Sequence, residues 1–152
     1  PGPYPKIHMI HGRMSEREVA SLYRHEKIKA LVSFTRGEGF GLPILEAAAS
    51  GMPIIATNWS AHTEFLKLGR YIPVKYNLVN LPNSRIDNNI FIPNAKWAEP
   101  DENDAKARLK KFRKSDSIPK KWAEELKEKL VKKYRQSDIE KIYDSHLGIY
   151  FE

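Results

Sequence analysis

The stretch that decides the fold is Gly37-Glu38-Gly39-Phe40-Gly41-Leu42-Pro43-Ile44-Leu45-Glu46-Ala47-Ala48-Ala49-Ser50-Gly51. It lies between two short apolar runs, Ala30–Phe34 and Pro53–Thr57, of the kind that form parallel strands covered on both faces. Pro43 suits the first turn of a helix, and Gly51 suits the position just past its end. The pattern therefore predicts a strand, a glycine-rich turn, a helix and a second strand, in that order.

The sequence before and after this unit continues the alternation. Residues 6–10 read as a short strand, and Ser15-x-x-Glu18 is a capping box that predicts the start of a helix. Further along, Ser60 is expected to cap a short helix that ends at Leu66, and Tyr71–Val74 reads as a fourth strand. Strands alternating with helices favour an α/β fold: a Rossmann-like parallel sheet with right-handed crossovers.

The second half of the chain has a different pattern. Residues 77–94 form a long polar excursion that allows a strand at 89–92. From Asp101 onward apolar residues recur at helical spacing, and Ser137-x-x-Glu140 is a second capping box. We therefore expect one domain over 1–152, with an α/β portion at 6–100 and a tail of helices at 101–152.

Composition limits the possible classes of protein. The chain has 152 residues, 30% of them charged and 41% hydrophobic, which suits one globular domain and excludes wholesale disorder. It contains no cysteine, so disulfides and thiolate metal sites are excluded, and its histidines are not spaced with carboxylates as a metal site requires. No apolar run is long enough to cross a bilayer. The net charge of +7 favours an anionic partner.

The glycine-rich turn is where chemistry is expected. It follows a strand and leads into a helix N-terminus, where free N–H groups and the helix dipole attract phosphate. We therefore predict an anionic ligand over Gly39 to Leu42. Glu38 and Glu46 flank this position, and a carboxylate accepts two hydrogen bonds well from a vicinal diol. A diphosphate joined to sugars, with ribose and hexose diols, would suit both features.

These residues resemble a known family. Glu38-Gly-Phe-Gly-Leu-Pro-x-Leu-Glu46, with Gly51-x-Pro53, is similar to the Glu-x7-Glu signature of retaining, metal-independent glycosyltransferases with the GT-B fold, family 4 type. The resemblance extends over roughly Lys6 to Tyr143. It implies a C-terminal donor-binding domain for a nucleotide diphosphate sugar, from which a hexose passes to an acceptor hydroxyl.

The resemblance also implies residue roles. Glu38 would contact the donor sugar as the catalytic candidate, and Glu46 would bind the ribose hydroxyls. Backbone N–H groups would hold the sugar and diphosphate, and the base would stack near residues 11–14. The expected donor-binding residues beside Glu46 are Gly39, Phe40, Gly41, Leu42, Gly12, Arg13, Met14 and Glu64. No metal and no cofactor other than the donor substrate is implied, and Gly41→Val should be harmful because its side chain would intrude on the ligand's oxygens.

The chain departs from the family pattern in several places. Many relatives have Gly-Gly where this chain has Ser60-Ala61-His62. Two strand–helix units, with an Arg and a Lys that neutralise the diphosphate, and the N-terminal acceptor domain have no counterpart here. We therefore expect a fragment that is inactive alone, with the absent N-terminal domain as a partner. A shortened sheet should expose an apolar edge and favour self-association.

The basic excess is concentrated late in the chain, where residues 106–135 hold 13 basic and four acidic side chains. A solvated helix face is the first interpretation, and peripheral contact between a cytoplasmic protein and an anionic membrane is the second. Two alternatives to sugar transfer stay open: a non-catalytic module that binds a nucleotide or sugar phosphate, and a basic protein associated with nucleic acid, although no reader motif favours the latter.

Overall fold

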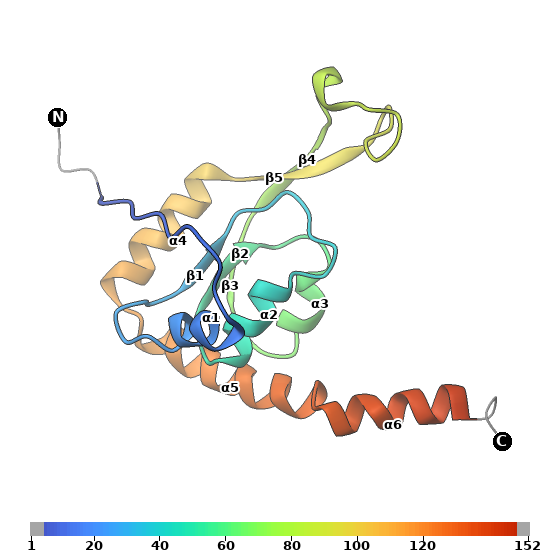
Figure 1. Cartoon of the computed structure of the whole chain (residues 1–152). Coiled ribbons are helices and arrows are strands. Elements are labelled where there is room, and N and C mark those ends of the chain that lie inside the picture. The colour runs from blue at the N-terminus through green and yellow to red at the C-terminus, as the bar shows by residue number, and fades with distance from the viewer. Residues whose placement is uncertain (1–4, 149–152) are drawn as a thin grey trace.

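A parallel three-stranded sheet forms the centre of the molecule, whose computed structural model describes residues 5–148. The strands are β1 (Leu31–Ser33), β2 (Ile54–Thr57) and β3 (Ile72–Val74), in that spatial order. Leu31 lies opposite Ile54, and Ile55 lies opposite Ile72. Figure 1 shows the three strands side by side. The predicted α/β class and parallel sheet are thus confirmed, with three strands in this sheet over residues 5–148 instead of the expected four.

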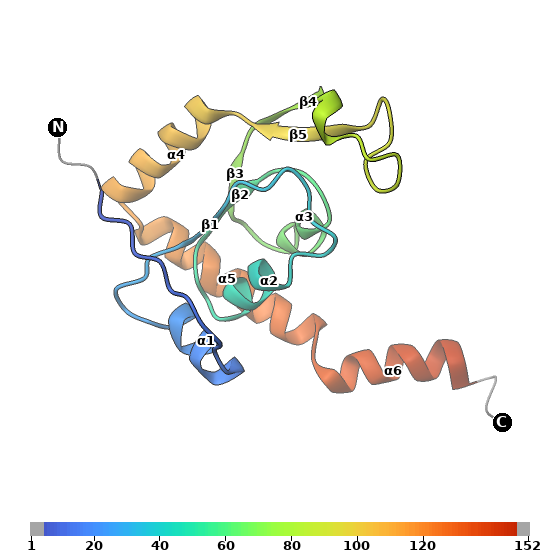
Figure 2. The ribbon, with the colours of Figure 1, turned by 45° about the horizontal axis from the view of Figure 1, so that its top comes forward.

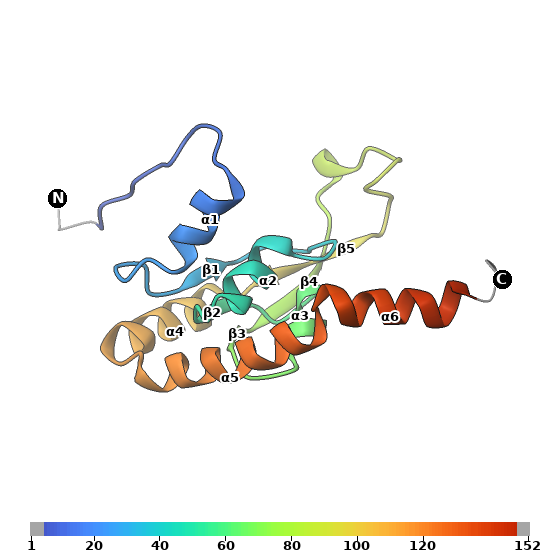
Figure 3. The ribbon, with the colours of Figure 1, turned by 60° about the horizontal axis from the view of Figure 1, so that its bottom comes forward.

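Helices cover both faces of the sheet. On one face, α2 (Leu42–Ala49), α3 (His62–Leu66) and α5 (Ser117–Lys133) pack on Ile54 and Ala56 of β2. On the other face, Ala105 of α4 (Glu102–Lys114) packs with Ile55, which points the opposite way from its neighbours in β2. Figures 1 and 3 show these helices around the sheet. This alternation is what an apolar strand covered on both sides requires.

Of the two predicted capping boxes, one forms and the other does not. Ser15 and Glu18 form the predicted capping box of α1 (Glu16–Tyr23). The second box does not form, because α6 (Gln136–Leu147) starts earlier and the Gln136 side chain bonds Glu140 at 2.8 Å. All the side chains of α6 are exposed or half-buried, and the helix extends away from the body (Figure 3).

Residues 6–10 do not form the predicted strand. The segment is irregular, and Ile7, Met9 and Ile10 are all exposed. A strand needs a hydrogen-bonded neighbour, which a pattern of apolar residues does not provide. Within residues 5–148 no strand pairs with the outer side of β1, so β1 is an edge where Val32 and Phe34 are exposed. Self-association through this edge stays a prediction.

A second small sheet replaces the predicted strand at 89–92. Its strands, β4 (Tyr76–Asn80) and β5 (Lys96–Pro100), form an antiparallel ribbon that projects beside α4 (Figure 2). The loop between them includes a 3-10 turn, Asn83–Arg85. The Asp87 carboxylate accepts the N–H groups of Asn89, Ile90 and Phe91 at 2.8–2.9 Å, which holds that stretch in a turn. The prediction of a strand there was wrong because Asp87 takes the N–H groups that a ladder would need.

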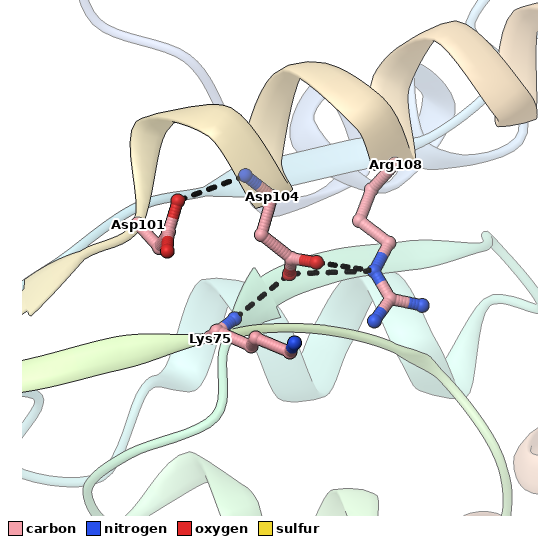
Figure 4. A network of polar contacts seen from close by, with 4 residues as sticks. All are labelled: Lys75, Asp101, Asp104 and Arg108. Atoms are coloured by element: carbon pink, nitrogen blue, oxygen red, sulfur yellow. Dashed lines mark hydrogen bonds and ion pairs between the residues drawn. The ribbon is translucent and has the colours of Figure 1, made fainter.

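Asp104 anchors α4 to the end of β3. Its carboxylate accepts the Lys75 N–H at 3.0 Å and pairs with Arg108 at 3.3 Å, while Asp101 caps the helix by accepting the Asp104 N–H (Figure 4). The Lys75 N–H, followed by Arg108, lowers the pKa of the Asp104 carboxyl below its ordinary 3.8. The folded state therefore stabilises the charged Asp104 carboxylate more than the unfolded chain does.

Replacing Asp104 should produce a pH-dependent loss of stability. The contribution of this carboxylate is complete above its unfolded pKa and is lost as the pH falls through the lowered folded pKa. We expect Asp104→Asn to lower the free energy of unfolding by about 1 kcal/mol at neutral pH, and by almost nothing at acid pH. Urea unfolding at several pH values measures this, with Glu128→Gln, an exposed carboxylate on α5, as the control. A loss of equal size at every pH would contradict the anchor.

Candidate functional site

The glycine-rich turn connects the end of β1 to the start of α2, and Gly41 determines its shape. Gly41 has φ +87°, in the left-handed region, and its carbonyl accepts the first N–H bonds of α2 from Ile44 and Leu45. A Cβ at this position would lie 3.0 Å from the Cβ of buried His62. Gly39 differs, because no atom lies within 4 Å of a Cβ placed there. The fold itself thus requires glycine at position 41, whereas a side chain at position 39 would enter open space.

Ser60 fixes the turn from the neighbouring loop. Its hydroxyl accepts the Glu38 N–H and donates to the Glu38 carbonyl, both at 2.8 Å. Ser60 does not cap α3 through its side chain as predicted; its carbonyl accepts from Thr63, and its φ of 83° is left-handed. The ring of Phe40 lies 5.6 Å from that of Phe65, on α3. The loop before α3 therefore holds the backbone on either side of the Glu38 α-carbon.

The N–H groups that were expected to meet an anion are available. In the described part of the chain, no protein acceptor takes the N–H of Gly39, Phe40, Gly41 or Leu42. Gly39, Phe40 and Leu42 are exposed, whereas Gly41 itself is buried. Three neighbouring exposed residues with unsatisfied N–H donors at the positive end of α2 make this surface suitable for an anion.

Glu46 lies on the exposed side of α2, just over one turn into the helix, and faces α1. It borders a cavity of about 420 Å³, the α1–α2 pocket, which is lined by Met14, Glu16, Val19, Ala20, Tyr23, Glu46 and Ser50. The Tyr23 hydroxyl donates to a Glu46 oxygen at 3.5 Å. Burial, with a smaller effect of the Glu46 charge, raises the pKa of Tyr23, so the phenol keeps its proton. The structure thus brings Glu46 together with Met14, and adds Tyr23.

The other predicted residues are dispersed. Glu38 is half-buried in the turn and is not part of the pocket lining. Gly12, with φ +126°, and Arg13 lie exposed just before α1. Glu64 is exposed in the first turn of α3 and is likewise outside the α1–α2 pocket. Tyr23 was missed as a site residue because its spacing placed it only on the apolar face of α1.

His62 is a structural residue. It is fully buried, and its Nε2 donates to the Thr57 carbonyl at 2.7 Å. Its Nδ1 and the Thr57 hydroxyl are buried and have no hydrogen-bond partner among residues 5–148. The Cβ of His62 lies 3.0 Å from where a Cβ on Gly41 would be, and His62 does not line the α1–α2 pocket.

Metal binding and membrane insertion are two further possibilities for residues 5–148. No group of three His, Asp or Glu side chains in that range is arranged to hold a metal ion. No helix in that range is both long and apolar enough to cross a membrane.

Comparison with known proteins gives one match. The family model described as "Glycosyl transferases group 1" matches residues 4–77, from before α1 into β4. Every predicted site residue lies within this segment. No curated protein and no solved structure matches the chain. Residues 4–77 are thus similar to group 1 glycosyltransferases. This similarity supports a role for the segment in glycosyl transfer.

Proposed function

We propose that this chain binds a nucleotide diphosphate sugar and presents its hexose for transfer to an acceptor hydroxyl with retention. The observation that carries the proposal is the row of unsatisfied N–H groups at Gly39–Leu42, flanked by Glu38 and Glu46. It occurs inside the segment that is similar to group 1 glycosyltransferases. A diphosphate suits the N–H groups, and sugar diols suit the carboxylates.

Glu46 is proposed to bind the ribose. Its carboxylate accepts one hydrogen bond from Tyr23 and has further acceptor sites for a diol. The α1–α2 pocket would receive the nucleoside, with the base near Met14. Gly12 and Arg13 would approach it from the segment before α1, and Glu64 would approach the ligand from α3.

Glu38 is proposed to face the donor sugar. Ser60 fixes its backbone, so its carboxylate is attached to a rigid part of the turn. The N–H groups of Gly39–Leu42 would stabilise the charge that grows on the leaving diphosphate. Fixed backbone dipoles do this without reorganising during the reaction, so the proposal assigns this task to no metal ion.

Removing the Glu46 carboxylate should weaken donor binding without unfolding the protein. We expect Glu46→Ala to raise the dissociation constant for a nucleotide diphosphate sugar by about 10- to 100-fold, since hydrogen bonds to a charged acceptor are lost. Calorimetric titration measures this against Glu128→Ala, an exposed carboxylate on α5, as the control. Equal affinities for wild type and Glu46→Ala would refute the role of Glu46.

The corner between α4 and α5 is proposed as a peripheral contact with an anionic membrane. Within residues 5–148, no carboxylate pairs with the exposed cations Lys110, Lys111 and Lys114, and nearby Ile118 is 58% exposed. Cations near an anionic surface contribute roughly 1 kcal/mol each, and an exposed apolar side chain can enter the interface.

Vesicle sedimentation tests this corner. We expect the chain to sediment with phosphatidylglycerol-containing vesicles, and changing these three lysines to Gln to weaken binding at least about tenfold. The matched control removes three exposed lysines, 129, 132 and 133, from the far end of α5. Equal losses in the two variants, or tighter binding to an oligonucleotide than to the vesicles, would contradict a membrane-facing corner.

A further inference from the structure

A second cavity lies outside the proposed donor site. It occupies about 1060 Å³ and is lined by residues from the end of β1, the β4–β5 ribbon and the first half of α4. Figure 2 shows where these elements lie in the fold. It shares no lining residue with the α1–α2 pocket, and most of its lining comes from residues 91–109, beyond the segment that matches a family model. We call it the ribbon cleft. Four aromatic side chains line it: Phe34, Trp59, Phe91 and Trp97.

One wall of the ribbon cleft is formed by three side chains in contact: Arg36, Glu99 and Trp97. The Arg36 guanidinium makes two hydrogen bonds to Glu99, at 2.6 and 2.9 Å, and lies 4.4 Å from the centre of the Trp97 ring. The Ala98 N–H also donates to the Arg36 carbonyl at 3.3 Å. Arg36 lowers the pKa of the Glu99 carboxyl, which therefore stays charged. A planar donor, a planar acceptor and an indole are thus held together at the rim, all partly open to solvent.

Most of the charges that line the ribbon cleft are paired. Arg36 pairs with Glu99, and Lys106 pairs with Glu102, so of the cations that line the cleft only Lys96 has no carboxylate partner among residues 5–148. A phosphate entering here would meet two carboxylates. A neutral ligand with one apolar face and several hydroxyls fits better, because C–H groups pack on indole rings while hydroxyls bond planar charged side chains. A pyranose ring has this character.

We propose that the ribbon cleft binds a neutral pyranose unit of a carbohydrate, with its apolar face on the cleft tryptophans and its hydroxyls on Arg36 and Glu99. Gly37 lines the cleft and Glu38 follows it directly, so a sugar held here lies beside the turn that is proposed to face the donor. Pyranose binding by the cleft does not rest on the proposed function.

Tryptophan fluorescence can test the cleft selectively. Of the three tryptophans in the chain, Trp59 and Trp97 line the cleft, whereas Trp122 packs between α5 and β3. The Trp122→Phe variant therefore reports on the cleft alone. Titration with the methyl pyranosides of glucose, mannose and galactose, up to about 50 mM, should give a saturable emission change with at least one of them, with a dissociation constant in the millimolar range.

A matched pair of arginine variants gives the control, in the Trp122→Phe background. Arg36→Met should weaken glycoside binding at least about fivefold, since it removes donors that contact hydroxyls. Arg70 also pairs with a glutamate, but it lies on α5's side of the molecule and outside the cleft, so Arg70→Met should leave binding unchanged. No saturable change with any glycoside, equal effects of the two variants, or the same emission change with a nucleoside diphosphate alone would overturn the proposal.

The two proposals fail separately. Glycoside binding that persists in Glu46→Ala supports a cleft that is independent of the donor pocket. If nucleotide diphosphate sugars do not bind but a glycoside does, the proposed function falls and the pyranose site stands. If the donor binds and no glycoside does, the ribbon cleft proposal alone is overturned.

Discussion

Gly41→Val should lower the free energy of unfolding by about 2–4 kcal/mol, the largest expected effect of any single change in the turn. Position 41 has φ +87°, which a β-branched residue adopts only with strain. The new Cβ would also lie 3.0 Å from the Cβ of His62, which is fully buried. Urea unfolding followed by circular dichroism measures the loss.

The reason for this cost differs from the one that the sequence suggested. The sequence predicted that a side chain at Gly41 would intrude on the ligand, but the structure places the clash inside the protein. Gly39→Ala is the matched control, because the space around position 39 is open. We expect it to change stability by less than about 1 kcal/mol, while it weakens donor binding by occupying that space. Equal stability of Gly41→Val and wild type would contradict the assigned shape of the turn.

Leu126→Ala should lower the free energy of unfolding by about 2–5 kcal/mol. Leu126 is 1% exposed and packs against α2, in the cluster that contains Ala47 and Ala48. Its Cβ and Cα also lie about 3 Å from where a Cβ on Gly69 would be, so α5 lies closely against the loop after α3. Truncation leaves a cavity that this tightly packed region cannot close.

Val131→Ala on the same helix gives the comparison. Val131 is 45% exposed, and alanine favours a helix more than valine does, so its effect should be near zero. A large loss for Leu126→Ala alone would mean that the late helix α5 belongs to the same cooperative unit as the glycine-rich turn. Equal, small losses in the two variants would instead mean that α5 is not part of that core.

The central sheet could be predicted from the sequence because its strands are nearly continuous apolar runs. Ala30–Phe34 and Pro53–Thr57 contain β1 and β2, and both faces of β2 are buried. Residues 6–10 are also rich in apolar side chains, but a strand requires a neighbouring strand, and the pattern contains no information about one. The ribbon was missed for a related reason, since β4 and β5 are separated by 15 residues without a short turn signal.

Only one part of the candidate site could be predicted from the sequence, namely the glycine-rich turn and the start of α2. The glycine spacing, Pro43 and the helix start are local signals, and the structure contains the turn that they indicate. The contact of Tyr23 with Glu46 joins residues 23 positions apart, and the Ser60–Glu38 bonds join residues 22 apart. Helical spacing assigns Tyr23 to the apolar face of α1 and cannot show that its hydroxyl reaches α2. The ribbon cleft is assembled from four separate segments, so no single motif indicates it.

The most direct test of the donor site is an amide NMR titration of the ¹⁵N-labelled chain with a panel of uridine, guanosine and adenosine diphosphate sugars. One member of the panel should shift the N–H resonances of Gly39, Phe40, Gly41 and Leu42 strongly and saturably, and leave those of Asn77 and Ala98 in the ribbon unchanged. If no member of the panel shifts the four turn amides, or if the shifts occur only in the ribbon or on the basic helices, the chain does not bind its donor at the N-terminus of α2.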